Sequence, residues 1–308
     1  MATIEVDGKG FPPSYARLNA LHNLSISRLD LVRSMITVGY KNEADLTGYG
    51  WRSMGWHLSS TMLALVLTES NGGDLTVSRL FNSLDRSEKG TSSYKLGMSL
   101  SKLVAEMLLG IPWLVFVDKL FNTGALVLQA GTFERGDLAG QDMHGQWHVC
   151  EAKGRSSPPR PTLLSKAKRQ AQRIVSINGN PPATASASLV HLYRTPIRVE
   201  WEDPEPKGDV AIGIKERDFH LAYYGILLEL LDLGKVDALS VANHIFDVAY
   251  FDVGNERLGV GLLREIRQDV TKTRALTTRF HEALQAETRS KQFSIGMDGV
   301  LATLSPKT

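Results

Sequence analysis

Two carboxylates and an amine lie within one short stretch of the chain, in a pattern that suits metal-assisted hydrolysis. Asp137 precedes a Gly-rich segment, and Glu151 and Lys153 form a Glu-x-Lys sequence at the end of an apolar run. Carboxylate oxygens are the ligands that Mg²⁺ and Mn²⁺ prefer. A lysine beside such an ion can orient a water molecule or stabilise a developing anion. Hydrolysis of a phosphodiester bond requires this set of groups.

A strand over residues 146–152 would position the Glu-x-Lys pair. Residues two apart on a strand face the same side, so Glu151 and Lys153 project together. The segment 140–145 is rich in the residues that tight turns need, and a hairpin there would bring an aspartate beside Glu151. Asp137 and Asp142 are the two candidates for that position.

The surrounding pattern predicts an order of helix, three strands, helix and strand. Residues 85–93 read as a polar linker, and apolar residues recur at helical spacing over 94–109 and 162–177. The expected strands are 113–117, 125–129, 146–152 and 188–193. Further helices are expected at 18–38, 51–67 and 219–233, and a polar helical stretch at 264–290. A hairpin over 247–262 and a closing strand at 299–304 complete the expected elements.

The run over residues 134–156 resembles the signature of the PD-(D/E)xK (restriction-endonuclease-like) nuclease superfamily. In that signature a Pro-Asp pair is followed by strand residues, a turn and a strand that ends in Glu-x-Lys. The resemblance assigns the first carboxylate to Asp137 and leaves Asp142 in the turn. It also implies that the backbone carbonyl of Ala152 is a metal ligand. The chain departs from the signature at Gly136, which stands where proline is usual.

The resemblance extends over about residues 94–195 and implies an α/β fold with a restriction-endonuclease-like core, a mixed central sheet flanked by helices. We expect this core at 91–200, a mainly helical N-terminal region at 1–90 and an α+β C-terminal extension at 201–308. Many superfamily members carry a metal-ligating glutamate on the helix before the first strand, which makes Glu106 a candidate. Some carry a glutamine on the helix after Glu-x-Lys, which makes Gln170 a candidate for the catalytic site.

Residues 151–173 carry seven basic side chains against Glu151 alone, a local net charge of +6. Lysine and arginine strengthen nucleic-acid binding by releasing counterions from phosphates. Arg155, Lys166, Arg169 and Arg173 are the candidate phosphate contacts. A charged helix face is also often simply solvated, so the neighbouring motif is what favours nucleic acid.

Composition is that of an ordinary globular protein. The chain has 308 residues, a net charge of +2 and one cysteine, Cys150, which excludes an internal disulfide and suits the cytoplasm. Its N-terminus lacks a secretory signal pattern, and its apolar runs are too short to cross a membrane.

The sequence therefore predicts a cytoplasmic endonuclease that uses Mg²⁺ or Mn²⁺ and acts on DNA. Superfamily members often serve prokaryotic defence, repair or mobile-element systems. The alternative is a nuclease-fold subunit that has lost cleavage and binds nucleic acid or a protein partner through its N-terminal or C-terminal region. Because cutting both strands needs two active sites, a homodimer is a further expectation.

Overall fold

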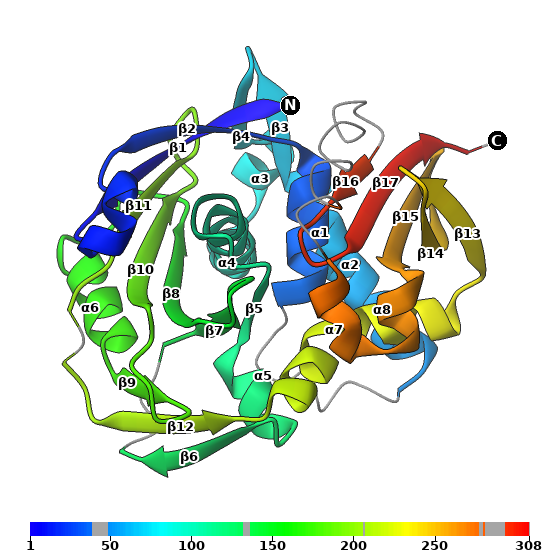
Figure 1. Ribbon diagram of the computed structural model, residues 1–308. Coiled ribbons are helices and arrows are strands. Elements are labelled where there is room, and N and C mark those ends of the chain that lie inside the picture. Colours follow the sequence, from blue (N-terminus) through cyan, green and yellow to red (C-terminus); the bar gives the residue numbers. More distant parts are fainter. Residues whose placement is uncertain (39–48, 132–135, 206, 277–279, 281–292, 308) are drawn as a thin grey trace.

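A curled, nine-stranded mixed sheet dominates the computed structural model, which describes residues 1–38, 49–131, 136–205, 207–276, 280 and 293–307 (Figure 1). The strand order is β3-β4-β1-β11-β10-β8-β7-β5, and β2 pairs with β1. The strands are β1 (Ala2–Lys9), β2 (Leu21–Ile26), β3 (Thr68–Asn71), β4 (Asp74–Val77), β5 (Trp113–Phe116), β7 (Leu138–Gln141), β8 (Trp147–Arg155), β10 (Thr184–His191) and β11 (Arg198–Glu202). At its centre β8 runs parallel to β10 and antiparallel to β7.

Two smaller sheets flank the large one. The first joins β6 (Leu126–Ala130), β12 (Val210–Ile214) and β9 (Ile174–Ile177). The second is an antiparallel C-terminal sheet with the order β13-β14-β15-β17-β16. Its strands are β13 (Val236–Val241), β14 (His244–Val253), β15 (Glu256–Leu263), β16 (Phe293–Ile295) and β17 (Val300–Pro306).

Helices lie inside the curl of the large sheet, outside it, and between it and the C-terminal sheet. They are α1 (Arg28–Val38), α2 (Trp51–Leu67), α3 (Arg79–Ser83), α4 (Arg86–Leu109), α5 (Val117–Asn122), α6 (Thr162–Ala171), α7 (Glu216–Leu233) and α8 (Arg264–Gln268), with 3₁₀ turns at Pro13–Leu18 and Val270–Ala275. Figure 1 shows α4 enclosed by the curl, α6 outside it, and α1 and α7 toward the C-terminal sheet.

Two glycines set the depth at which α4 lies in the curl. A Cβ on Gly97 of α4 would lie 2.6 Å from the backbone nitrogen of Gly154 in β8. A Cβ on Gly154 would lie 1.8 Å from the carbonyl oxygen of Ser93. Both distances are far below van der Waals contact, so only glycine allows helix and strand backbones to meet here.

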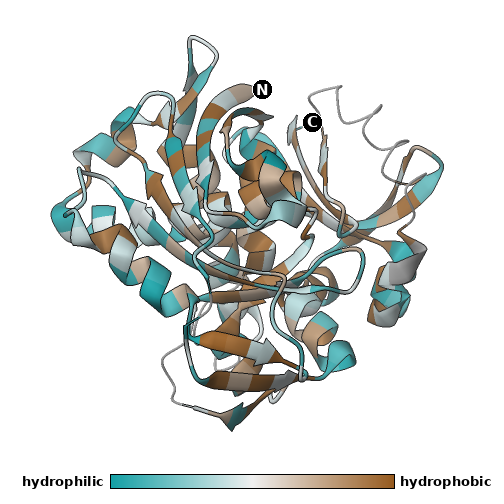
Figure 2. Cartoon of the chain, turned by 60° about the vertical axis from the view of Figure 1, so that its left-hand side comes forward, coloured by the Kyte–Doolittle hydropathy of each residue, from teal (hydrophilic) through white to brown (hydrophobic). Residues whose placement is uncertain are grey.

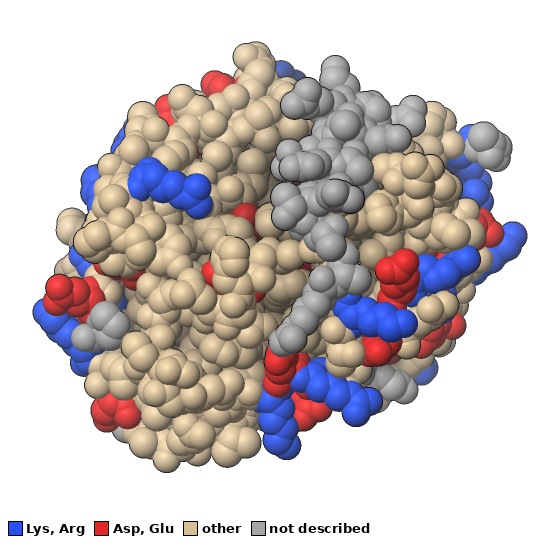
Figure 3. Space-filling model, viewed as in Figure 1, with Lys and Arg blue, Asp and Glu red and all other residues tan. Residues whose placement is uncertain are grey.

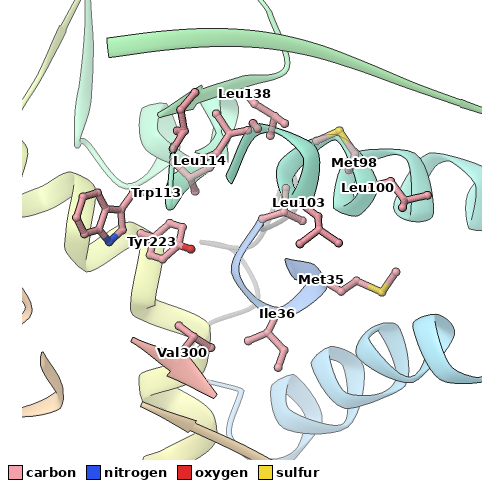
Figure 4. Close-up of a cluster of buried hydrophobic side chains, with 14 of the residues drawn as sticks. Met35, Ile36, Met98, Leu100, Leu103, Trp113, Leu114, Leu138, Tyr223 and Val300 are labelled. Carbon is pink, nitrogen blue, oxygen red and sulfur yellow. The ribbon is translucent and has the colours of Figure 1, made fainter. Parts of the chain in front are cut away.

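One hydrophobic core runs through all three regions predicted from the sequence. It joins Ile4 in β1, Leu103 in α4 and Leu301 in β17, all at most 1% exposed. Figure 4 shows its centre, where side chains of α1, α4, β5, β7, α7 and β17 converge. Hydrophobic residues concentrate on the strands and inner helices, and hydrophilic ones on loops and outward helix faces (Figure 2).

The N-terminal region differs most from its predicted structure. Four strands, β1 to β4, lie in the region expected to be mainly helical, and residues 18–38 divide into β2 and α1. The predicted linker at 85–93 is the first part of α4, where Asp85 and Glu88 form a reciprocal capping box. The predicted boundary at residue 90 therefore falls inside a helix, and β1 pairs with β11 of the predicted core.

Elsewhere most predicted elements are present with shifted ends. The strands at 113–117, 146–152 and 188–193, the helix at 219–233, the hairpin at 247–262 and the closing strand are confirmed. The strand at 125–129 exists as β6 but joins a separate sheet. The helix at 162–177 is shorter, because α6 ends at Ala171 and residues 174–177 form β9. Of the predicted stretch at 264–290, α8 and a 3₁₀ turn are present, and residues 277–279 and 281–290 lie outside the described residues.

We predict that Gly97→Ala destabilises the protein by about 1–3 kcal/mol, the usual cost of overpacking a filled interior. Gly90→Ala is the matched control, because Gly90 lies in the same helix and its added Cβ would meet no atom within 4 Å. Alanine should stabilise the helix at that position by up to about 1 kcal/mol. Urea unfolding monitored by circular dichroism measures both changes. Equal effects of the two substitutions would contradict a close contact between α4 and β8.

Candidate active site

Asp137, Glu151 and Lys153 lie together where β7 begins beside β8, and we call them the carboxylate cluster. The Asp137 amide donates a hydrogen bond to Glu151 Oε2 at 2.9 Å. Lys153 Nζ donates to Asp137 Oδ2 at 3.3 Å and also forms an ion pair with Glu151 Oε1. The predicted hairpin therefore brings the three predicted residues into contact.

The backbone of Ala152 lies at the edge of β8 that faces Asp137. The paired register of β7 and β8 ends at Leu138 and Cys150, and the Ala152 amide instead donates to Asp137 Oδ2 at 3.2 Å. The N–H and C=O of a strand residue point toward the same neighbouring strand. The Ala152 carbonyl therefore also lies on the edge that faces Asp137.

Glu151 is a buried acid. Its side chain is fully buried, whereas those of Asp137 and Lys153 are 18% and 23% exposed. Burial, with the nearby Asp137 carboxylate, raises the pKa of Glu151 to about 8, and the Lys153 ammonium only partly offsets this. Burial thus shifts Glu151 toward its protonated form, against the opposing effect of the Lys153 ammonium.

For Lys153, the effect of the neighbouring acidic groups is larger than the effect of burial. Burial disfavours its charge, but Asp137 and Glu151 together outweigh burial and raise the pKa of Lys153 above its usual value. The Lys153 ammonium therefore remains charged beside the two acidic side chains.

Gly136, which departs from the superfamily signature, has a packing reason. A Cβ at this position would lie 2.8 Å from Val149 Cγ1 and 3.8 Å from the Cα of Ala171. A larger residue would push β8 and the end of α6 apart. Glycine thus allows the backbone at residue 136 to pass between them.

Asp142, the alternative aspartate, lies in the turn between β7 and β8. Its Oδ1 accepts hydrogen bonds from the amides of His144 and Gln146, both at 2.8 Å. Its other oxygen lies 3.6 Å from His148 Nε2, at the start of β8. This carboxylate closes the turn, and Asp137 is the aspartate that contacts Glu151.

Glu106 does not join the cluster, and its prediction as a metal ligand beside Asp137 is wrong for this structure. Its Oε2 lies 2.8 Å from Arg33 Nη1, and its Oε1 accepts from the Met297 amide at 3.1 Å. Nine residues separate Glu106 from Gly97, a rotation of about 180° around the helix. Glu106 therefore faces α1 and the C-terminal segment, on the side of α4 away from β8.

Arg33 and Glu106 belong to a buried network of charges. Arg33 Nη1 lies 3.6 Å from Asp298 Oδ1, and Lys102 Nζ lies 3.7 Å from Asp298 Oδ2. Tyr223 of α7 donates to the same Asp298 oxygen at 2.6 Å. All these side chains are at most 5% exposed. The network joins α1, α4 and α7 to the loop before β17.

Gln170 lies in the last turn of α6, the helix that packs on β8 and β10. Its neighbour Ala171 is fully buried and approaches Gly136. The Oε1 atom of Gln170 is buried and has no hydrogen-bond partner among the described residues. A buried amide oxygen without a partner is costly, so this atom is an available acceptor near the cluster.

Three of the four predicted phosphate contacts line one cavity of about 390 Å³. Arg155, Lys166 and Arg169 meet there with Arg86 and Arg160, and no lining residue is acidic. On the face shown in Figure 3, by contrast, basic and acidic residues are interspersed. Arg155 follows Lys153 by two strand residues, about 7 Å, so the cavity lies next to the cluster.

The fourth predicted contact, Arg173, lies elsewhere. Its Nη1 is 3.7 Å from Asp209 Oδ1, and its backbone packs against Gly208. Arg173 follows the end of α6, so the predicted helical alignment with Lys166 does not hold. Arg86 was missed by the sequence analysis, although the Asp85–Glu88 capping box marks the helix start that places it.

No protein-family model, curated protein or solved structure matched this chain when its sequence and fold were compared with known proteins. Across the described ranges, no group of three or more His, Cys, Asp or Glu side chains is arranged to hold a metal ion. No helix in this part of the chain is both long enough and apolar enough to cross a bilayer.

We predict that Glu151→Gln raises Tm increasingly as the pH rises, in the absence of divalent metal. The pKa of Glu151 is about 8 in the fold against a reference of 4.5, so folding favours the protonated form. That stabilisation is complete below about pH 4.5 and is lost as the pH rises through about 8. Glutamine stays neutral, so the variant should match the wild type at pH 5 and exceed its Tm by roughly 3–5 °C at pH 9. A pH-independent difference in calorimetry would contradict a raised pKa.

We predict that Glu106→Ala costs about 3–5 kcal/mol, because it leaves Arg33 buried with an incomplete set of partners. Mn²⁺ affinity, measured by calorimetry on the folded variant, should be unchanged, because Glu106 faces away from β8. Asp252→Ala is the control, since its ion pair with Lys307 is exposed and its loss should change stability little. A loss of Mn²⁺ affinity in Glu106→Ala, but not in Asp252→Ala, would show that Glu106 is a metal ligand after all.

Proposed function

We propose that this protein is a metal-dependent nuclease that hydrolyses phosphodiester bonds, with DNA as its substrate. The observation that carries the proposal is the contact between Asp137, Glu151 and Lys153 at the junction of β7 and β8. These residue types, brought together on adjacent strands, match the requirements of metal-assisted phosphodiester cleavage.

The donor set suits Mg²⁺ or Mn²⁺. Asp137, Glu151 and the Ala152 carbonyl supply hard oxygen atoms at one edge of β8. The high pKa of Glu151 supports a cation here, because a divalent charge beside this carboxyl would favour its ionised form. A bound ion of this kind supplies hydroxide from water and offsets negative charge on the phosphate.

Lys153 and Gln170 have roles that follow from their positions. The Lys153 ammonium is held by both carboxylates and is partly exposed, so it can donate to a water molecule or a phosphate oxygen beside them. The unpartnered Gln170 oxygen can accept a hydrogen bond from that water or from the substrate. Both residues would orient the reactants.

The basic cavity is the proposed binding site for the substrate backbone. Five cationic side chains, with no acidic residue in the lining of the cavity, attract a run of phosphates, and the cavity begins about two strand residues beyond Lys153. A nucleic-acid backbone held by Arg155, Lys166 and Arg169 would bring an adjacent phosphate to the carboxylate cluster.

A second candidate function is a nuclease-fold subunit that binds nucleic acid or a protein without cutting. Two observations favour it. The described residues offer no three-residue metal group, and Lys153 already pairs with both carboxylates. In that case the basic cavity would still bind phosphates.

We predict Mg²⁺- or Mn²⁺-dependent cutting of plasmid or single-stranded DNA that falls at least about 100-fold in Glu151→Gln and Lys153→Met. Asp137→Asn should lose activity similarly, because Asp137 contacts both other members of the cluster. Asp142→Asn is the matched control: it keeps an oxygen for the two turn amides and should retain activity.

Cutting rates on gels, compared at equal folded fractions, test this prediction. Cutting that survives both Glu151→Gln and Lys153→Met would reject the site. The absence of cutting under all metal conditions, with oligonucleotide binding retained, would favour the non-cutting subunit.

A further inference from the structure

Three aromatic rings are exposed at the start of α2, and the proposed hydrolysis does not use them. Tyr49, Trp51 and Trp56 are 61%, 68% and 50% exposed. Tryptophan is usually well buried, because its ring carries a large apolar surface. Two exposed tryptophans within one and a half turns of a helix therefore require an explanation beyond folding.

These rings belong to one continuous helix face. The exposed residues Trp51, Arg52, Gly55, Trp56 and Ser59 follow the spacing of a single stripe along α2. A Cβ at Gly55 would meet no atom within 4 Å, so packing does not require glycine here. Glycine costs a helix about 1 kcal/mol relative to alanine. Its effect is to leave an open surface beside the two indoles.

Cations are interleaved with the rings. Arg52 Cζ lies 5.1 Å from the centroid of the Trp51 ring, and Lys95 Nζ of α4 lies 4.9 Å from that of Trp56. The whole of α2 contains no acidic residue. We call Tyr49, Trp51, Arg52, Trp56 and Lys95 the aromatic face.

Lys95 links the aromatic face to α4, the helix that contacts β8. Lys95 also donates a hydrogen bond to Ser60 of α2 at 2.8 Å, which ties α4 to α2. Gly97, two residues after Lys95 in α4, meets Gly154 of β8, the residue that follows Lys153. The helix α4 therefore connects the aromatic face and the carboxylate cluster.

We propose that the aromatic face binds unpaired bases of a single-stranded nucleic acid whose backbone reaches the carboxylate cluster. Exposed rings offer stacking surfaces for bases, and the interleaved cations match the phosphates. Duplex DNA hides the faces of its bases, so this surface selects single strands or frayed ends. The inference rests on the proposed nuclease function and specifies its substrate class.

The test measures binding separately from cutting. Fluorescein-labelled single-stranded DNA and RNA of about 20 nucleotides, and the corresponding DNA duplex, are titrated with the full chain in EDTA and followed by anisotropy. Trp51→Ala and Trp56→Ala should each weaken single-strand binding by about 5-fold to 100-fold, with duplex binding changed less than about 2-fold. Wild-type tryptophan fluorescence should be quenched by the single strands.

Tyr250→Ala is the matched control, because Tyr250 forms a similar ring–cation pair with Arg257, at 5.6 Å, in the C-terminal sheet. It should bind all probes like the wild type. Single-strand affinity that is unchanged in both tryptophan variants would overturn the proposal, as would a wild type that binds no single strand. A dimer that the tryptophan variants abolish, without a change in oligonucleotide affinity, would make the face a contact between copies and also overturn it. The nuclease proposal fails on a different result: cutting of DNA that survives the Glu151→Gln substitution.

Discussion

The contact between α4 and β8 is the constraint on which the rest of the structure depends. Gly97 and Gly154 allow the two backbones to meet, so the curled sheet closes around α4. On the other side of the helix, Glu106 and Lys102 enter the buried charge network with Arg33 and Asp298. A helix anchored on both sides fixes β8 relative to α1, α7 and the C-terminal sheet.

Burial on the other face of β8 gives the carboxylate cluster its electrostatic character. Glu151 lies on the face of β8 opposite Gly154, where its register partner Ala187 packs on Ala167 and Ala171 of α6. Its side chain is fully buried there, and its pKa rises to about 8. Asp137 and Lys153 are partly exposed at the edge of the cluster. The divalent cation of the proposed function would favour the ionised form of Glu151.

Three surfaces with different chemistry meet around the N-terminal half of α4. The carboxylate cluster lies at the edge of β8, the basic cavity includes Arg86 of the first turn, and the aromatic face includes Lys95. Under the proposed function, these surfaces would contact the cleaved phosphate with its cation, the neighbouring phosphates and the bases.

The sequence alone determined the local pattern of the cluster. Alternation along β8 placed Glu151 and Lys153 on one face, and turn residues indicated the hairpin that brings Asp137 to them. These features depend on neighbours in the chain, so spacing suffices to predict them. Tertiary structure decided which helix faces meet the sheet. It turned Glu106 toward Arg33, ended α6 before Arg173, and added β1 to the sheet through β11. Such outcomes depend on contacts between residues far apart in the chain, which periodicity in a single segment does not specify.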